Sequence, residues 1–311
     1  MPFFSVIIPL YNKENFIRNT IESVLNQTFQ DFEIIVINDG STDKSAEKVK
    51  ELNNPKINHF RTENQGVSNA RNIGIQKSKA DYICFLDADD YWLENHLDVL
   101  HNLILDFPEA GMYCSRYTMK ISSSKEIKPK FQGIDNNFRG YIDDYFYSSL
   151  VYRVAWTSAI VIKKNVFDDV GMFDVNISSG QDTDMWIRVT LKYRTAVSDR
   201  VTTIYNAQIA NSLSKTNILK KKLMDFEKFS QDEKKNPSLK KFLDLYRTGY
   251  AIAFYMNGKK DISKKYLDNV RIENIPYKVK ILLNMPPMLL RGLLKLKHLL
   301  KKKGLDFSIY H

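Results

Sequence analysis

The sequence predicts an α/β fold: a mostly parallel sheet flanked by helices, with a basic helical C-terminal extension. Short apolar runs alternate with amphipathic helical segments over the first two thirds of the chain, which is the pattern of strand–helix–strand units. The charge is distributed unevenly, because residues 1–210 hold 23 Lys and Arg against 27 Asp and Glu, whereas residues 211–311 hold 23 against 9. We therefore expect one α/β domain over residues 1–210 and a basic helical region over residues 211–311.

Each element of the predicted domain follows from a local pattern. Continuous apolar runs predict strands buried on both faces, and apolar residues repeated every three or four positions predict helices. The expected strands are residues 4–10, 32–37, 57–61, 82–86, 112–119 and 156–163, and the expected helices are residues 16–27, 44–52, 68–79 and 94–107. Ser41, Thr42 or Asp43 can cap the second helix. The polar residues 122–140 predict a loop.

The composition excludes several classes of protein. Cys84 and Cys114 both lie in apolar runs, so we expect neither a disulfide framework nor a zinc site. No uninterrupted apolar run reaches the ~20 residues that a membrane-spanning helix needs. The chain begins directly in a strand pattern, which predicts no signal peptide and a cytoplasmic protein.

The most informative stretch is the acidic end of the fourth expected strand. Asp87, Asp89 and Asp90 follow the apolar run Tyr82–Leu86. Carboxylates close together repel one another and resist burial. A divalent cation such as Mg²⁺ or Mn²⁺ resolves that conflict, because it binds one or two carboxylates together with substrate phosphates. For the acidic cluster taken alone, an ordinary turn is the alternative.

Other polar residues follow the neighbouring strands at the same expected edge of the sheet. Pro9–Asn12 ends the first strand, Asp39 follows the second, and Arg71 lies early in the helix before the acidic strand. Ligands of such sheets bind outside the carboxyl ends of the strands. We therefore expect these residues and Asp87–Asp89 to form one cleft.

Six segments follow one another in an order and spacing that is specific as a combination, although no single segment is specific. They are Ser5–Asn12 (SVIIPLYN), Ser23–Thr28 (SVLNQT), Phe32–Asp43 (FEIIVINDGSTD), Gly66–Gly74 (GVSNARNIG), Phe85–Asp90 (FLDADD) and Gly180–Trp186 (GQDTDMW). Over roughly residues 3–210 the chain thereby resembles family 2 glycosyltransferases with the GT-A fold, a Rossmann-like sheet. The resemblance implies an enzyme that transfers a sugar from a nucleotide-sugar to an acceptor hydroxyl, usually with inversion.

The resemblance also implies a nucleotide site at the rim of the first two strands. Asp39 is expected to accept a hydrogen bond from a pyrimidine ring N–H, as the matching position reads uracil in similar enzymes. Its alternative is a turn-forming Asp before Gly40. Tyr11 can pack on the base, and Pro9 and Asn12 either shape the rim or only form a rigid strand exit.

The phosphates and the metal are assigned to the acidic strand end and the helix before it. Arg71 is expected to neutralise the diphosphate or hold the aspartates; its alternative is a solvated helix face. Asp89 is the expected direct ligand of Mn²⁺ or Mg²⁺. Asp87 and Ala88 are expected to line the nucleotide-sugar site, where Asp87 reaches the ribose or supports the metal. The metal stabilises the departing nucleoside diphosphate. Asp90 can instead orient the loop.

Inverting transfer needs a base, because an acceptor hydroxyl is too weak an acid to attack unaided. Asp182 matches the base in the family's Glu-Asp pair, and Gln181 replaces the Glu, which puts the local hydrogen-bond pattern in question. The alternative for Asp182 is helix capping, a role that also suits Asp184. Trp186 and Arg188 are expected to brace this helix.

The last basic segment predicts an amphipathic helix. Residues 289–303 carry six Lys and Arg and no acid, and the leucines on one helical face are Leu289, Leu293, Leu296 and Leu300, with Leu290 and Leu294 beside them. Such a helix can lie on an anionic membrane, so residues 276–303 are a candidate membrane-association segment. The alternative is a helix that docks its leucines on the catalytic domain. Nucleic acid is not expected as a partner, because the segment lacks interleaved aromatics.

Together with these patterns, the resemblance implies a metal-dependent inverting hexosyl- or N-acetylhexosaminyl-transferase on the inner face of the cell membrane. The expected donor is a UDP-sugar, and the expected acceptor is a glycan or lipid-linked hydroxyl in bacterial surface polysaccharide synthesis. Two alternatives stay open. One is a nucleotidyltransferase on a similar sheet, which would need a Gly-rich loop near Pro9–Asn12. The other is a non-catalytic nucleotide-sugar-binding subunit, which would be expected to lose the aspartates.

Overall fold

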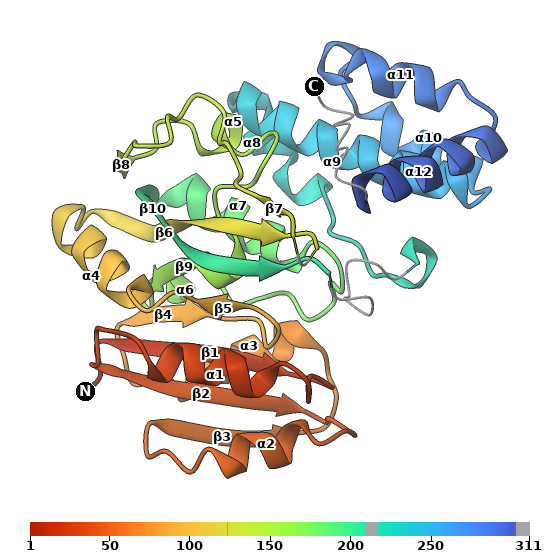
Figure 1. Ribbon diagram of the computed structural model, residues 1–311. Coiled ribbons are helices and arrows are strands. Elements are labelled where there is room, and N and C mark those ends of the chain that lie inside the picture. The colour runs from red at the N-terminus through yellow and green to blue at the C-terminus, as the bar shows by residue number, and fades with distance from the viewer. Residues whose placement is uncertain (123, 209–216, 303–311) are drawn as a thin grey trace.

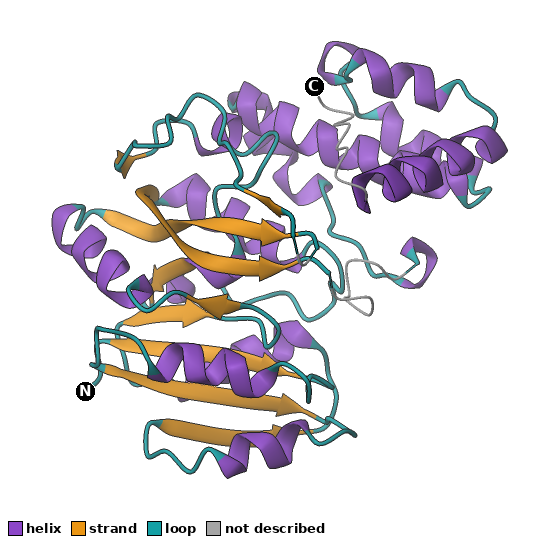
Figure 2. Ribbon diagram, in the orientation of Figure 1, coloured by secondary structure: helices purple, strands orange, loops and turns teal. Residues whose placement is uncertain are grey.

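The protein is built on one large sheet with helices on both faces and a group of helices at one end (Figures 1 and 2). The computed structural model describes residues 1–122, 124–208 and 217–302. The strand order is β3-β2-β1-β4-β9-β6-β10-β5, with β7 paired to β6 and β8 paired to β10. The predicted α/β class with a helical C-terminal region is therefore confirmed.

The first four strands are parallel and lie where the apolar runs predict them. The register sets Leu10 opposite Asn38 and Ile7 opposite Phe85, so the carboxyl ends of the three central strands share one edge of the sheet. The strands are β1 (Phe4–Leu10), β2 (Phe32–Asp39), β3 (Ile57–Thr62) and β4 (Tyr82–Phe85), and the helices between them are α1 (Ile17–Leu25), α2 (Ser45–Glu51) and α3 (Val67–Lys77).

The rest of the sheet is mixed. β9 (Ile160–Lys163) runs antiparallel between β4 and β6 (Ala110–Lys120), and β10 (Arg194–Asn206) is parallel to β6. The expected strand over residues 156–163 is shorter, because residues 157–159 form a 3₁₀ turn, η1. The other elements are β5 (Tyr91–Trp92), α4 (His96–Asp106), β7 (Glu126–Ile127), β8 (Gly140–Tyr141), α5 (Tyr145–Ser148), α6 (Val166–Val170) and α7 (Gln181–Lys192).

Strand β10 is absent from the sequence-based expectations. Its apolar residues are interrupted by the polar triplet Ser198–Arg200, and its pairing with β6 is irregular at this point. The strand therefore lacks the continuous or alternating pattern that predicts strands. Its place is decided by β6, which offers a long parallel edge.

Two apolar cores cover the two faces of the sheet. Alternate residues of β1 point to opposite faces: Ile8 belongs to the core beneath α1 and α4, and Ile7 to the core beneath α3 and α7. Both side chains are fully buried. A strand covered on both faces reads as a continuous apolar run, which is why the sequence marks β1 so clearly.

The C-terminal region is an array of helices around α9. Its elements are η3 (Ile218–Lys220), η4 (Glu227–Phe229), α8 (Ser230–Lys235), α9 (Pro237–Met256), α10 (Lys260–Asp268), η5 (Ile272–Asn274), α11 (Tyr277–Leu283) and α12 (Pro287–Lys302). α9 starts sharply, because the side chain of Asn236 accepts from the N–H of Leu239 at 2.9 Å and Pro237 occupies the first turn. None of the described helices is long and apolar enough to cross a membrane.

This helical array shares a core with the sheet. Phe226, Phe242 and Leu243 belong to the same buried cluster as Phe85 and Trp186. The predicted boundary near residue 210 therefore separates two regions by sequence composition, while their apolar side chains pack together. This packing fixes where α9 lies relative to α7.

Candidate active site

The residues expected in one cleft lie at the carboxyl edge of β1, β2 and β4. Asp39 ends β2 and is 4% exposed. Its two carboxylate oxygens accept from the N–H groups of Gln65 and Gly66, each at 2.8 Å. Gly66 directly precedes α3 and has φ 92°, a conformation that favours glycine. Oδ1 also lies 3.5 Å from the hydroxyl of Thr62. Asp39 therefore anchors the loop that leads into α3.

The end of β1 is fastened to the loop after β2. The side-chain oxygen of Asn12 accepts from the N–H of Thr42 at 2.8 Å, and the N–H of Asn12 donates to Oγ of Ser41 at 3.1 Å. Asn12 is in the left-handed region with φ 50°. Tyr11 beside it is 46% exposed. Asn12 thus shapes the rim, while the ring of Tyr11 remains accessible to a ligand.

Arg71 lies in α3 and forms an ion pair with Asp87. Its Nη2 is 2.8 Å from Oδ1 of Asp87, and its side chain is 3% exposed. Nε and Nη1 of Arg71 are buried without a hydrogen-bond partner in the described part of the chain. Asp87 itself is partly exposed. The guanidinium therefore holds one aspartate and retains donor capacity at the same place.

Asp89 forms an ion pair with Lys13. Burial and the neighbouring Asp87 raise the pKa of Asp89, and Lys13 opposes this rise. Asp87 and Asp89 therefore each contact one cation of the protein. Lys13 follows the predicted Pro9–Asn12 motif directly, yet the sequence interpretation did not include it.

Asp90 differs from the other two aspartates in its surroundings. It is 1% exposed, and its two oxygens accept from Oγ of Ser158 at 2.6 Å and from the N–H of Asn206 at 3.0 Å. Burial and the two neighbouring aspartates raise its pKa well above the ordinary value. Thr20 on α1 completes this anchoring by donating to the carbonyls of Ala88 at 3.0 Å and Asp90 at 2.8 Å. Asp90 thus orients the loop.

The residues at this edge fit a divalent cation bound together with phosphates. No group of three or more acidic, His or Cys side chains that could hold a metal occurs among the described residues. Mg²⁺ sites commonly use only one or two carboxylates and complete their shell with water and phosphate oxygens. Asp87 and Asp89 supply that number, and a cation on Asp89 would exchange with the ammonium of Lys13.

Asp182 lines a pocket of about 750 Å³ between α7 and α9. It is the second residue of α7, which follows Gly180 in the left-handed region with φ 90°. Its Oδ1 accepts from the N–H of Thr183 at 2.7 Å. The other lining residues are Ser149, Leu150, Val151, Arg153, Trp156, Ser178, Ser179, Gly180, Gln181, Thr183, Asn217, Ile218, Lys221, Leu223, Phe242, Leu245, Tyr246, Gly249, Tyr250, Ala253 and Asn257.

The pocket and the acidic edge are joined by a short segment before β9. Trp156 lines the pocket. Two residues later, Ser158 accepts from the N–H of Asp87 at 3.2 Å and donates to Asp90. The structure therefore places the acidic edge and Asp182 on either side of residues 156–158.

The other polar residues of α7 brace the helix. Asp184 is fully buried and pairs with Arg188 at 3.0 Å and with Lys228. Arg188 also donates to the carbonyls of Val170, Gly171 and Met172. Trp186 is 2% exposed in the core. Trp186 and Arg188 have the bracing positions expected of them. Asp184 was expected to cap the helix and instead pairs with Arg188 and Lys228.

Two further side chains beside Asp182 escaped the sequence interpretation. Arg153 comes from the loop before β9 and Tyr246 from α9, and Nε of Arg153 donates to the hydroxyl of Tyr246. Burial alone would lower the pKa of Arg153, but Tyr246 and Asp182 raise it. Nothing in the local sequence marks Tyr246, because its place beside Thr183 of α7, at 2.8 Å between the two hydroxyl oxygens, comes from the tertiary fold.

Comparison with known proteins places the N-terminal half in a family. The chain matches the model of glycosyl transferase family 2 over residues 5–171. An uncharacterized glycosyltransferase of Rickettsia bellii is 35% identical over 187 residues, which are 60% of this chain and 26% of that protein. One of Haemophilus influenzae is 44% identical over 108 residues, 34% of this chain and 43% of that protein. The chain spans between 26% and 58% of the first four curated relatives.

Solved structures show the same fold. S. aureus TarS 1–349 in complex with UDP-GlcNAc is similar with a TM-score of 0.61 and 17% identity, covering 86% of this chain and 93% of that chain. S. aureus TarS 1–349 in complex with UDP is similar with a TM-score of 0.57 and 18% identity, over 87% and 88%. The matched residues 5–171 include β1 to β4, the acidic edge and β9. Since that match covers more than half of the chain, the protein belongs to glycosyl transferase family 2.

Proposed function

We propose that the protein transfers a sugar from a UDP-sugar to a hydroxyl of a glycan or lipid-linked acceptor, with inversion at the anomeric carbon. The observation that carries this proposal is the pairing of Asp87 with Arg71 and of Asp89 with Lys13 at the strand edge, beside the pocket that contains Asp182. A diphosphate and a reacting sugar need these two parts next to each other. The structures of S. aureus TarS with UDP and with UDP-GlcNAc support a uridine nucleotide as the donor.

The donor end of the site binds and neutralises the leaving group. Tyr11 is accessible for stacking on the base at the rim that Asp39 and Asn12 hold in place. Arg71 and Lys13 supply positive charge where the diphosphate develops negative charge. Mn²⁺ or Mg²⁺ on Asp89 and Asp87 would add further stabilisation of that charge when bound.

The acceptor end supplies the base. As the acceptor oxygen forms its bond to the anomeric carbon, its proton passes to the carboxylate of Asp182. The bond between the anomeric carbon and the diphosphate oxygen breaks, and its electron pair leaves with the nucleoside diphosphate. The pocket offers aromatic rings for a sugar acceptor (Trp156, Tyr246 and Tyr250) and amides (Gln181, Asn217 and Asn257).

Both alternative functions have less support. A nucleotidyltransferase would present a glycine-rich loop after the first strand, but Pro9–Asn12 contains no glycine. A non-catalytic subunit would have no need for the aspartates, yet Asp39, Asp87, Asp89 and Asp182 are all present.

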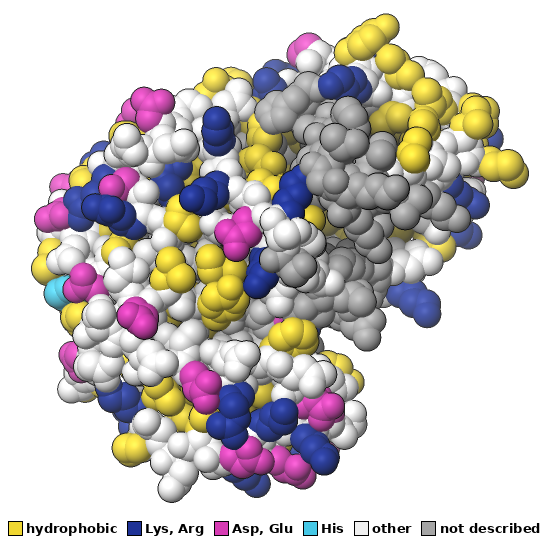
Figure 3. Space-filling view, viewed as in Figure 1, with side chains coloured by type: hydrophobic (Ala, Val, Ile, Leu, Met, Phe, Trp, Pro, Cys, Tyr) yellow, Lys and Arg dark blue, Asp and Glu magenta, His cyan; other side chains and the backbone are white. Residues whose placement is uncertain are grey.

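We also propose that the C-terminal helices rest on an anionic membrane, where a lipid-linked acceptor for surface polysaccharide would lie. Leu289, Leu293 and Leu296 of α12 are 61%, 43% and 51% exposed, and Met288 is 83% exposed. Figure 3 shows apolar side chains gathered over this end of the molecule. Leu290 is instead fully buried, and α12 contacts α9. Leu294 and Leu300 lie outside the described side chains.

Asp182→Asn tests the proposed chemistry. The amide cannot take up the acceptor proton, so turnover is expected to fall about 10²- to 10⁴-fold while UDP affinity stays nearly unchanged. The measurement is a panel of UDP-sugars for transfer and hydrolysis with Mn²⁺ present, together with UDP titration. Unchanged turnover of the variant would remove Asp182 as the base, and an active wild-type enzyme serves as the reference.

A further inference from the structure

A series of hydrogen bonds leads from Arg153 through Tyr246 of α9 to Thr183 and Asp182. Nε of Arg153 donates to the hydroxyl oxygen of Tyr246. That oxygen lies 2.8 Å from Oγ1 of Thr183. Oγ1 of Thr183 in turn lies 3.5 Å from Oδ1 of Asp182, a longer contact beside the 2.7 Å bond from the Thr183 N–H to the same oxygen.

The direction of these hydrogen bonds follows from what each group can donate. A guanidinium only donates, so the Tyr246 oxygen accepts from Arg153 and its own proton is left for Thr183. The hydroxyl proton of Thr183 is then left for Asp182. Burial raises the pKa of Tyr246, so the phenol keeps the proton that this arrangement requires. Each group therefore donates a hydrogen bond to the next one, from the guanidinium of Arg153 to the carboxylate of Asp182.

The two carboxylate oxygens of Asp182 differ in their hydrogen bonds. Oδ1 receives both donors of Thr183, whereas Oδ2 has no hydrogen bond within residues 1–122, 124–208 and 217–302. A carboxylate held by one oxygen presents the other in a defined position for an acceptor proton. Arg153 begins this series of hydrogen bonds, and the carboxylate of Asp182 is one of the groups that raise the pKa of Arg153.

We propose that Arg153, Tyr246 and Thr183 are positioning residues that orient the Asp182 carboxylate and stabilise its negative charge, which makes α9 part of the catalytic machinery. The inference rests on the proposed role of Asp182 as the base. It extends the site beyond the family match over residues 5–171, because Tyr246 comes from the middle of α9. The C-terminal region then contributes to turnover itself, apart from any contact with a membrane.

Tyr246→Phe is the central test. It removes the hydroxyl that joins Arg153 to Thr183 and leaves the ring in place. We expect kcat to fall about five- to twentyfold, which is the effect of losing one hydrogen bond to a charged network. KM for the donor is expected to stay unchanged, and the acidic limb of the kcat–pH profile is expected to move to higher pH, because the carboxylate loses stabilisation of its charged form.

The matched control is Tyr255→Phe. Tyr255 lies on the same helix, but its hydroxyl donates to the carbonyl of Met285 at 3.0 Å and it does not line the pocket. This variant removes the same atom from α9 and is expected to keep the wild-type kcat and pH profile. A similar loss of kcat in both variants would contradict the proposal.

Thr183→Val provides a second approach if Tyr246→Phe does not fold. It deletes the hydroxyl next to Asp182, keeps the backbone N–H, and should shift the pH profile in the same direction. Arg153→Met should shift it further, with partial return in Arg153→Lys. If all of these variants lose thermal stability but keep the wild-type pH profile, the network is only structural and the proposal is wrong.

Comparison with Asp182→Asn separates this inference from the proposed function. If Asp182→Asn keeps full turnover, the assignment of the base fails and the inference fails with it. If Asp182→Asn is inactive while Tyr246→Phe and Thr183→Val behave as wild type, only the positioning role fails. In the Asp182→Asn background, Tyr246→Phe is expected to cause no further loss of kcat.

Discussion

Lys13 and Arg71 each form an ion pair with one of the two partly exposed aspartates. Asp89 pairs with Lys13, and Asp87 pairs with Arg71. Asp90 instead accepts hydrogen bonds from Ser158 and Asn206. Each carboxylate thus has its own partner, although the three are almost adjacent in the chain. The difference in burial separates Asp87 and Asp89, the two residues proposed for the donor site, from the loop anchor Asp90.

The ionisation of Asp89 leads to a pH prediction. Its pKa lies above the ordinary value because of burial and the neighbouring Asp87. A protonated carboxyl does not bind Mn²⁺, so Mn²⁺-dependent UDP affinity should be constant at neutral pH and fall as the pH drops through this raised pKa. The loss therefore starts at a higher pH than for an exposed aspartate. Calorimetric titration between pH 8 and pH 5 measures it.

The control for this titration is Asp89→Ala. The variant is expected to bind UDP weakly and equally with and without Mn²⁺ at every pH. Equal affinity of the wild-type protein with and without Mn²⁺ would contradict the metal assignment. In that case the positive charge that balances Asp89 would come from Lys13 alone.

At the scale of elements, α1 holds the acidic loop in shape. The Thr20 hydroxyl on α1 contacts two carbonyls of this loop, those of Ala88 and Asp90, and Thr20 is 2% exposed. Buried carbonyls that lose a donor are costly. Through Thr20, α1 therefore helps to set the shape of the loop that carries Asp87 and Asp89.

Thr20→Val is expected to destabilise the protein by about 1–3 kcal/mol, because two buried carbonyls lose their hydroxyl partner. KM for the donor is expected to rise, since the loop carries Asp87 and Asp89. Urea unfolding and donor kinetics measure the two effects. The matched control is Thr190→Val on α7, where the hydroxyl contacts the carbonyls of Trp186 and Ile187 in its own helix and a smaller change is expected. Equal effects in both variants would show that the contact across elements has no special role.

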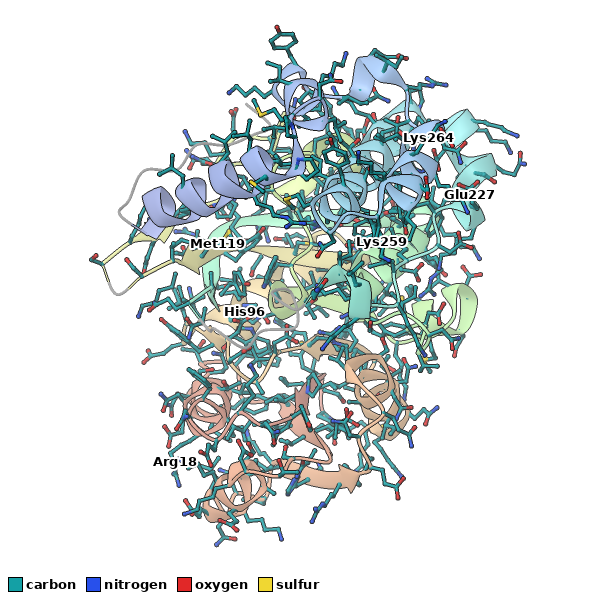
Figure 4. The ribbon with its side chains drawn as sticks, turned by 90° about the vertical axis from the view of Figure 1, so that its right-hand side faces the viewer. Arg18, His96, Met119, Glu227, Lys259 and Lys264 are labelled. Atoms are coloured by element: carbon teal, nitrogen blue, oxygen red, sulfur yellow. The ribbon has the colours of Figure 1, made fainter. Side chains whose placement is uncertain are left out.

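At the scale of the whole molecule, the C-terminal helices and the first strands lie at opposite ends. Figure 4 shows the helices above and β1 to β3 below, with the rest of the sheet between them. α9 faces the pocket with Tyr246 and Tyr250, and α12 packs on α9 with Leu290 buried. A membrane bound by α12 would therefore lie at this end of the molecule, and α9, which contacts α12 and lines the pocket, would connect the two.

The exposed leucines of α12 give the corresponding prediction. Replacing Leu289, Leu293 and Leu296 by Ser should release the protein from anionic vesicles, because about 1.5–3 kcal/mol of apolar transfer is lost for each side chain. Co-sedimentation with phosphatidylglycerol vesicles at low salt measures binding, and neutral vesicles provide the comparison. The substitutions leave the buried Leu290 in place, so the fold and UDP binding should persist. If the wild-type protein ignores anionic vesicles, the membrane proposal is wrong.

The sequence was informative wherever a residue's role depends on its near neighbours in the chain. β1, β2 and β4 were predicted because strands buried on both faces are continuously apolar, and Asp39 and Asp87–Asp90 were predicted because they follow such strands. β10 was not predicted, because its apolar pattern is interrupted and β6 decides its place. Lys13 was within reach of the sequence, since it follows the Pro9–Asn12 motif directly.

The sequence by itself therefore determined the parallel strands β1 to β4, the acidic edge and the family, because these depend on short local patterns. Only the tertiary structure decided which cation meets which aspartate and that Arg153 and Tyr246 lie beside Asp182. Arg153, Thr183 and Tyr246 come from three separate segments, and no local pattern records their meeting. The shared core of α9 and the sheet brings them together, because burying apolar surface fixes helix positions regardless of distance along the chain.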